Sequence, residues 1–173
     1  MPLPLKTERL IIRPYRDDDA TALHDVFGSS DVMRWTPSPP SRDVAETTQR
    51  LARTMAFTAR QPSGLGLWAL ELNEPTDFLG QVGLFPVEGK GPDVEVAYEL
   101  APRVWGHGYA TEAARALIDY GFRELALPRV VALILPDNAR SRNVAAKCGM
   151  SLEGPGRFYG LDLLVYSRRS ALG

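Results

Sequence analysis

Apolar and polar residues follow two periods along this chain, one typical of strands and one typical of amphipathic helices. Residues 7–15 partly alternate, and residues 130–135 are six consecutive apolar residues, as in a strand buried on both faces. Apolar residues recur at helical spacing over residues 111–125. The predicted strands are residues 7–15, 65–72, 78–87, 94–100, 130–135, 150–154 and 162–167. The predicted helices run from residues 17–19 to Gly28, from Ser41 or Asp43 to Gln61, over 111–125 and over 138–148.

The order of these elements predicts a mixed sheet. A strand, a glycine-containing loop, a helix and a buried strand make a βαβ unit, so strands 94–100 and 130–135 should be parallel neighbours. The turn-rich segments 73–77 and 88–92 are typical of antiparallel connections. We therefore expect one α/β (α+β) domain over residues 1–173, with a central, mostly antiparallel sheet of about seven strands and a parallel βαβ core flanked by helices.

Composition excludes several classes of protein. The 173 residues include 20 basic and 21 acidic ones, which leaves no overall field to attract nucleic acid or an anionic membrane. No segment approaches the ~20 apolar residues of a spanning helix, and the first residues lack the apolar core of a signal peptide, so we expect a cytoplasmic protein. The single cysteine, Cys148, cannot form an internal disulfide, and we expect it to pack in the core.

The segment 103–112, RVWGHGYATE, indicates an anion site between strand and helix. Gly106 and Gly108 allow a tight turn whose N–H groups point one way, and the following helix adds the positive end of its dipole. A dinucleotide fingerprint needs Gly or Ala where Thr111 stands, and no Gly-Lys-Ser/Thr run of a nucleotide hydrolase occurs. The spacing therefore favours a different pyrophosphate-bearing ligand.

Two sequence blocks resemble a known family. Arg-x-x-Gly-x-Gly at 103–108 resembles the acyl-CoA pyrophosphate loop of the GNAT superfamily of N-acyltransferases, and WGHGYATEA is similar to its ribosomal-protein alanine N-acetyltransferase branch. The segment 138–150, NARSRNVAAKCGM, resembles the second block of the family at the same separation. The resemblance implies a GNAT-like fold over nearly the whole chain, acetyl-CoA as cosubstrate and no metal. His24 and His107 are too isolated to suggest a metal site.

The resemblance also implies which residues bind acetyl-CoA. The strand backbone near 98–100 would bind the pantetheine arm, the glycine loop the diphosphate, and Asn138 the pantetheine amide. Lys147, with Arg140 and Arg142, would meet the ribose phosphate. The implied cofactor-binding residues are Tyr98, Leu100, Arg103, Trp105, Gly106, His107, Gly108, Tyr109, Ala110, Thr111, Asn138, Ser141, Asn143 and Lys147.

Two residues are candidates for the chemistry. EVAYEL at 95–100 resembles the family segment Glu-Ile-Gly-Tyr-x-Leu, and strand parity places Glu95 opposite the core-facing residues, so Glu95 is the candidate base, acting through a water. Many N-terminal acetyltransferases of the superfamily have a tyrosine acid where Ala145 stands here. By resemblance, Ser141 occupies a position from which it would protonate the departing thiolate, and Tyr159 and Tyr166 are the alternatives.

The acceptor is constrained by the ease of deprotonating it. An α-amine has a pKa of ~8. A lysine side chain has a pKa of ~10.4, so deprotonating it at pH 7 costs ~4.6 kcal/mol. A weak base therefore favours the α-amine of a protein N-terminus or an amino-acid-like small molecule. We expect the acceptor pocket to be built by Trp35, the loop 37–41, the second helix and residues 158–161.

Other functions stay open at this stage. A catalytically silent acyl-CoA-binding regulatory module, or an enzyme that acetylates a small amine such as an antibiotic or a polyamine, would carry the same cofactor motifs. For an acetyltransferase the partners are an acyl-CoA donor and an amine acceptor, with no nucleic acid and no membrane. The protein would be a monomer or a homodimer.

Overall fold

The computed structural model describes residues 4–171, which form one eight-stranded sheet with helices on both faces. The strand order is β1-β2-β3-β4-β5-β6-β8-β7. The strands are β1 (Leu5–Lys6), β2 (Leu10–Arg13), β3 (Gly66–Leu72), β4 (Phe78–Pro86), β5 (Val94–Leu100), β6 (Arg129–Ile134), β7 (Ser151–Phe158) and β8 (Leu161–Arg169). The helices are α1 (Ala20–Phe27), α2 (Ser30–Met33), α3 (Val44–Ala59), α4 (Tyr109–Arg123) and α5 (Ala139–Lys147), with short 3₁₀ turns η1 (Asp17–Asp19), η2 (Val87–Gly89) and η3 (Pro102–Val104).

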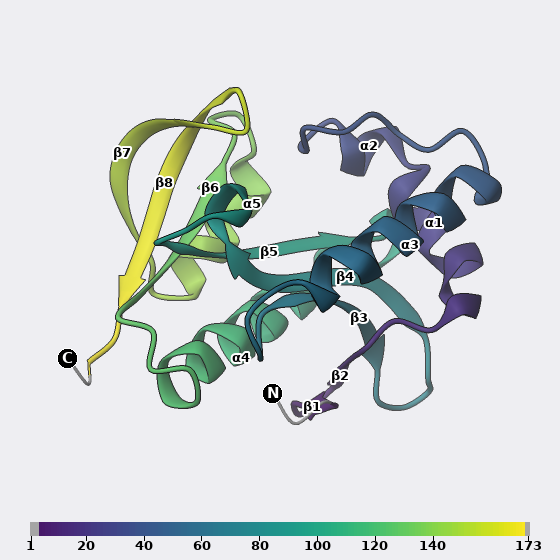
Figure 1. Ribbon diagram of the computed structural model, residues 1–173, viewed down its shortest axis with the longest axis horizontal. Coiled ribbons are helices and arrows are strands. Elements are labelled where there is room, and N and C mark those ends of the chain that lie inside the picture. Colours follow the sequence, from purple (N-terminus) through teal and green to yellow (C-terminus); the bar gives the residue numbers. More distant parts are fainter. Residues whose placement is uncertain (1–3, 172–173) are drawn as a thin grey trace.

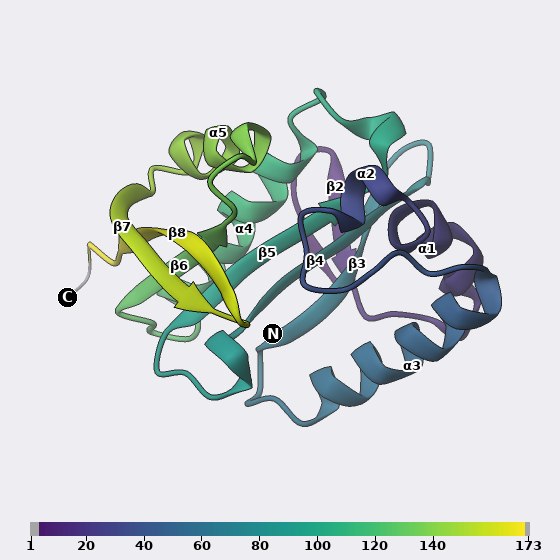
Figure 2. The same cartoon turned by 90° about the horizontal axis from the view of Figure 1, so that it is seen from above.

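The helices cover the two faces unequally. The α4 helix lies along one face of the central strands, while α1 and α3 lie on the other (Figures 1 and 2). The apolar stripe of α4 is fully buried, because Leu117 and Ile118 are both 0% exposed. The core thus fixes α4 beneath β4 and β5, and with it the glycine loop from which α4 begins.

The sheet divides between β5 and β6. These two strands are parallel, but they pair only at Val94↔Val130 and Glu95↔Val131. On its other side β5 pairs with β4 along its whole length. Beyond Glu95 the two strands therefore diverge, and β6, β7 and β8 stand apart from β1 to β5 (Figure 2). The diverging backbone leaves β5 without a strand partner on this side, where a ligand can bind.

The predicted topology is confirmed at its centre. Strand 94–100 has the predicted bounds, its partner 129–134 differs from the prediction by one residue at each end, and the two are parallel neighbours on either side of a helix. The mixed, mostly antiparallel sheet is also confirmed, although it has eight strands rather than about seven.

The differences lie at the ends of the chain and at element boundaries. The β1 strand and the short α2 helix were not predicted, and the first long strand is only four residues. The closing strands are longer than the predicted 150–154 and 162–167. The extension of β7 contains Pro155 and Gly156, which are typical of loops but are accepted in β7 because it is an edge strand. The α4 helix begins at Tyr109, two residues before the predicted start, and ends at Arg123, two before the predicted end.

We predict that Gly80→Ala destabilises the protein by about 2–4 kcal/mol, in the range of overpacking and backbone strain combined. Gly80 has φ +150, and a Cβ there would lie 2.2 Å from the carbonyl oxygen of Glu99 and 2.8 Å from the Cα of Leu100. The substitution would push β5 away from β4. Gly154→Ala is the matched control, because Gly154 has φ +140 and a Cβ there would meet no described atom within 4 Å. Urea unfolding of both variants measures the difference, and equal losses would contradict the packing argument.

Candidate active site

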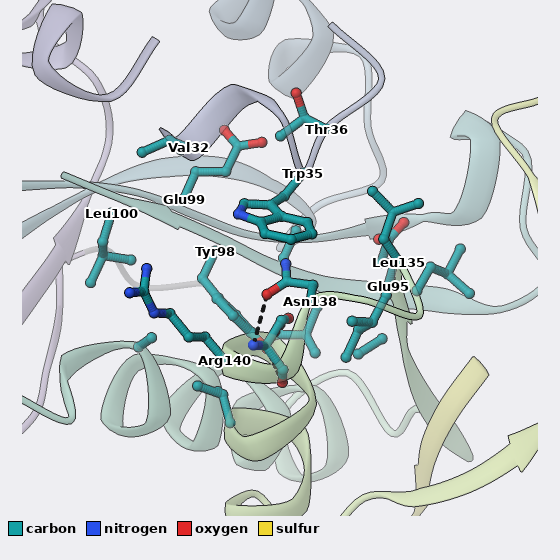
Figure 3. A pocket seen from close by; sticks show the side chains of 18 of the residues that line it. Val32, Trp35, Thr36, Glu95, Tyr98, Glu99, Leu100, Leu135, Asn138 and Arg140 are labelled. Atoms are coloured by element: carbon teal, nitrogen blue, oxygen red, sulfur yellow. Dashed lines mark hydrogen bonds between the residues drawn. The ribbon is translucent and has the colours of Figure 1, made fainter. Parts of the chain in front are cut away.

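A cavity of about 640 Å³ fills the space where β5 and β6 diverge. Its walls come from β5, the glycine loop, β6 and the first turns of α5, with the loop after α2 and the start of β8 closing it. Figure 3 shows Trp35 and Thr36 on one side of the cavity and Tyr98, Asn138 and Arg140 on the other. Segments far apart in the sequence therefore meet at one site.

The glycine loop presents backbone donors to this cavity. Gly106 and Gly108 have φ values of +83 and +81, and the first bond of the helix runs from Glu112 N–H to the Gly108 carbonyl at 3.0 Å. Within residues 4–171, no backbone acceptor bonds the N–H groups of residues 106–111. A row of free donors at the positive end of α4 suits a diphosphate.

An arginine from the N-terminal strand region fixes the loop, a contact that the sequence reasoning missed. The Arg9 guanidinium lies 2.6 Å from a Glu112 carboxylate oxygen and donates to the His107 carbonyl at 3.0 Å. The Arg9 N–H also donates to Glu112 at 2.9 Å. Because Arg9 and Glu112 are more than 100 residues apart, no local motif signals this contact.

Two of the predicted cofactor residues lie away from the cavity. Arg103 forms a bidentate ion pair with Asp77, with N–O distances of 2.6 and 3.0 Å, and also donates to the Phe78 carbonyl. His107 is exposed and points its Nδ1 at the carbonyls of Val104 and Trp105. All the other predicted cofactor residues line the cavity.

The start of α5 is joined to β5 through side chains. Asn138 caps the helix, since its Oδ1 accepts from Ser141 N–H at 3.1 Å. The Tyr98 hydroxyl donates to the Ser141 carbonyl at 3.1 Å and lies 2.9 Å from Ser141 Oγ. Burial raises the pKa of Tyr98, against the hydrogen bond to Ser141. The sequence reasoning used only the backbone near Tyr98, so the pairing of its phenol with Ser141 is new.

The side chains around Trp105 form a second group of contacts. Its indole N–H donates to the Leu100 carbonyl at 2.8 Å, so this carbonyl already has a donor. The Arg140 guanidinium lies over the Trp105 ring at 4.5 Å from its centre. Arg142 instead donates to the Tyr166 hydroxyl at 3.2 Å, outside the cavity lining. Ala145 is 1% exposed and packs in the core.

Glu95 is a buried carboxyl group at the cavity wall. It is 7% exposed and accepts a hydrogen bond from the Tyr159 hydroxyl at 2.7 Å. That hydroxyl accepts in turn from the N–H of Glu88 at 3.0 Å, and the Tyr159 N–H donates to the Glu88 carboxylate at 2.8 Å. Burial raises the pKa of Glu95 to about 7, although the bond from Tyr159 acts in the opposite direction, and the charge of Glu99 adds to the rise. The Tyr159 hydroxyl thus acts as a hydrogen-bond donor to Glu95.

A second carboxylate, which the sequence reasoning did not assign, also lines the cavity. Glu99 is half-buried and accepts from Gln81 Nε2 at 3.0 Å, and the Tyr15 hydroxyl donates to the Gln81 oxygen at 2.8 Å. Burial raises the pKa of Glu99, while the nearby Arg50 guanidinium lowers it. The two carboxyl groups are four residues apart on β5 and share a strand face.

The predicted acceptor pocket is present in part. Trp35 lines the cavity together with residues 36–38, but residues 39–41 do not. Tyr159 and Leu161 contribute, whereas Phe158 does not. The α3 helix lines a neighbouring, smaller cavity instead.

Residues 4–171 contain neither a candidate metal site nor a candidate membrane-spanning helix. No group of three or more histidine, cysteine or acidic residues lies close enough to hold a metal ion. No helix in this range has the length and apolar character to cross a bilayer.

Comparison with known proteins gives the family. The model of the acetyltransferase (GNAT) domain matches residues 9–151. The chain belongs to the GNAT acetyltransferase family. The Bacillus subtilis protein YkkB, itself uncharacterised, is 36% identical over 170 residues, which is 96% of this chain and 95% of YkkB.

Solved structures show the same GNAT fold. An acetyltransferase of this family from Bacillus anthracis superposes with a TM-score of 0.81 at 27% identity and covers 95% of this chain and 97% of its own. The ribosomal-protein-S5-alanine acetyltransferase from Vibrio fischeri has a TM-score of 0.75 at 20% identity, with 96% of each chain covered. Relatives of the ribosomal-protein branch are therefore among the structural neighbours of this GNAT protein.

We predict that Gly108→Val weakens CoA binding at least about tenfold, a loss of about 1.4 kcal/mol. A β-branched residue avoids φ +81, so the donors of the loop would turn away from the diphosphate. Gly149→Val is the control, because Gly149 has φ +73 at the end of α5 and lies outside the cavity lining. Calorimetric titration with CoA compares them, and equal affinities in the two variants would refute the role of the loop.

We also predict that Glu95→Gln stabilises the protein at alkaline pH. The pKa of Glu95 is raised from 4.5 to about 7, so its protonated form is favoured in the fold, and stability is lost as pH rises through about 7. At pH 8 the variant should gain about 3 kcal/mol over the natural protein, and near pH 4.5 the gain should vanish. Urea unfolding at both pH values checks this. Glu8→Gln, at an exposed position, should show no such pH-dependent gain.

Proposed function

We propose that this protein transfers the acetyl group of acetyl-CoA to an α-amine, that of a protein N-terminus or of an amino-acid-like small molecule. The observation that carries this proposal is Glu95, a buried carboxyl with its pKa raised to about 7, in the wall of the cavity between the diverging strands. A general base works best when its pKa lies near the working pH. The reaction is direct attack of the amine on the thioester within a ternary complex.

The geometry of the cavity supports acetyl-CoA as the donor. The free N–H groups of residues 106–111 would hold the diphosphate, and the unpaired side of β5 after Glu95 would hold the pantetheine arm. Asn138 and Lys147 line the same cavity beside this path. The microcin C7 self-immunity acetyltransferase, which shares the fold with a TM-score of 0.80 at 18% identity, was solved with acetyl-CoA and AMP.

The pKa of Glu95 favours an α-amine as acceptor. Moving a proton from an α-ammonium, with a pKa of ~8, to a base with a pKa of about 7 costs about 1.4 kcal/mol. The same transfer from a lysine at ~10.4 costs about 4.6 kcal/mol. If the base were an ordinary glutamate with a pKa of ~4.3, moving a proton to it even from the α-ammonium would cost about 5 kcal/mol. Burial of Glu95 thus removes most of the cost for an α-amine.

The leaving group needs a proton as the bond between the acetyl carbon and sulfur breaks. Ser141 Oγ and the Tyr98 hydroxyl, 2.9 Å apart, line the cavity near the start of α5. In the proposed reaction Glu95 takes a proton from the α-ammonium and releases it to solvent, and the neutral amine nitrogen then forms its bond to the acetyl carbon. As the bond between that carbon and sulfur breaks, the nitrogen gives its second proton to Glu95 and Ser141 donates a proton to the thiolate. Tyr98 passes its proton to Ser141 and is reprotonated from solvent, which also takes the proton from Glu95. Glu95 and Tyr98 lie on opposite faces of β5.

We predict that kcat/KM rises with pH through about 7, where Glu95 loses its proton. Glu95→Gln should lower kcat at least about 100-fold and remove this rise, as expected for a lost general base. Ser141→Ala and Tyr98→Phe should lower kcat while acetyl-CoA binding stays intact. Free-thiol release with short peptides beginning with Ala or Ser, amino acids, aminoglycosides and polyamines measures these effects.

The outcomes separate the proposal from its alternatives. Tight binding of acetyl-CoA without turnover on any acceptor would favour a silent acyl-CoA-binding module. Turnover on aminoglycosides or polyamines alone would favour a small-amine acetyltransferase. A pH profile that is unchanged in Glu95→Gln would remove Glu95 as the base.

A further inference from the structure

A second cavity, of about 520 Å³, adjoins the first on the side of α3. Three residues line both cavities, namely Leu67, Phe85 and Tyr159. Tyr159 therefore stands between the second cavity and Glu95, to which its hydroxyl is bonded at 2.7 Å. A ligand in the second cavity lies next to the proposed base.

The charged lining of this cavity is mainly positive. Arg50 and Arg53 come from α3 and Lys90 follows η2, and the acidic residue of the lining is Glu88. The Glu88 carboxylate already accepts the N–H of Tyr159 at 2.8 Å. Because the whole chain carries a net charge of −1, the cluster of three cations is a local feature.

Two of the cations lack a partner. Arg50 donates to the Pro39 carbonyl at 3.1 Å, packs over the Phe27 ring and interacts electrostatically with Glu99. Arg53 and Lys90 are exposed, and neither side chain forms a hydrogen bond or ion pair with any residue in the range 4–171. Their charges are available to a ligand.

Two phenylalanine side chains also line the cavity. Phe57 of α3 and Phe85 of β4 meet edge to face, with ring centres 5.9 Å apart. An apolar wall beside unpaired cations suits a ligand with an aliphatic segment that ends in an anion. The same cations would repel a polyamine.

We propose that the second cavity binds a carboxylate of the acceptor, so that the acceptor is a molecule that carries an α-amine and a carboxylate, and this rests on the proposed function. Arg53 and Lys90 hold the carboxylate while the amine lies beside Glu95. The carboxylate comes either from acidic residues that follow the N-terminal residue of a peptide or from a free amino acid. In both cases the cations orient the amine and raise its local concentration.

The first experiment compares matched acceptors. One pair is an Ala-initiated peptide with Asp and Glu at positions two and three against the same peptide with Asn and Gln. The other pair is a set of free amino acids against their amides. We expect the acidic member of at least one pair to have a kcat/KM at least about tenfold higher, as for charge-assisted contacts near a surface. The pair that responds identifies the source of the carboxylate.

The second experiment tests the two cations. The double variant Arg53→Gln with Lys90→Gln should reduce the preference for the acidic acceptor to about twofold or less. Arg60→Gln is the control, because Arg60 is an exposed cation next to the end of α3 and does not line the cavity. It should keep the preference. Equal kcat/KM for the acidic and neutral members in the natural protein would overturn the inference and leave the proposed function in place.

A binding measurement makes the inference independent of turnover. The N-acetylated acidic peptide, titrated calorimetrically into the CoA complex, should bind the natural protein and Arg60→Gln, and should bind the double variant at least about tenfold more weakly. Such binding without acetylation of any acceptor would overturn the proposed function and support the anion site. Equal binding of the acidic and neutral acetylated members in both pairs, the peptides and the N-acetyl amino acids with their amides, would overturn the anion site.

Discussion

The parallel pairing of β5 and β6 ends after two residue pairs, and the active site depends on this early end. Val94 and Glu95 pair with β6, and from Val96 onward the strands separate. Pairing with β4 holds β5 straight, while pairing with β8 holds β6, so neither strand can bend to close the gap. The unpaired backbone and the space beside it are the main elements of a cofactor site. Glu95 sits at the last position where β5 is paired on both sides, with β4 and with β6.

The two carboxyl groups of β5 lie on one face of the strand but have different hydrogen-bond partners. Glu95 and Glu99 share a face, and the pKa of each is raised because the surrounding protein shields its carboxyl group from water. Tyr159 donates to Glu95, whereas Gln81 donates to Glu99, with Arg50 nearby. The opposite face carries Tyr98, which meets α5 at Ser141. Strand alternation thus separates the proposed base from the proposed proton donor while holding both at one cavity.

Sequence reasoning reached what local patterns encode. The βαβ unit and the position of the glycine loop follow from hydrophobic period and glycine spacing, and the structure has both. The sequence patterns did not predict contacts between segments that are far apart in the chain. Tyr159 meets Glu95 over 64 positions and Arg9 meets Glu112 over 103, and such pairs depend on the packing of the sheet halves. Arg103 was assigned from its motif position to the cofactor, and in the fold its guanidinium pairs with Asp77, a contact that no local pattern signals.

The raised pKa of Glu95 ties stability to the proposed role of this residue as the base. A carboxyl group buried at 7% exposure costs the fold free energy whenever it is ionised, and the proposed base must be ionised to accept a proton. The Tyr159 hydroxyl reduces this cost through its 2.7 Å bond, but a second donor there would lower the pKa toward that of an ordinary glutamate. The base would then be too weak for an α-ammonium at ~8. A single phenol donor therefore balances the two demands, and the folding cost that remains is what keeps Glu95 basic enough for the reaction.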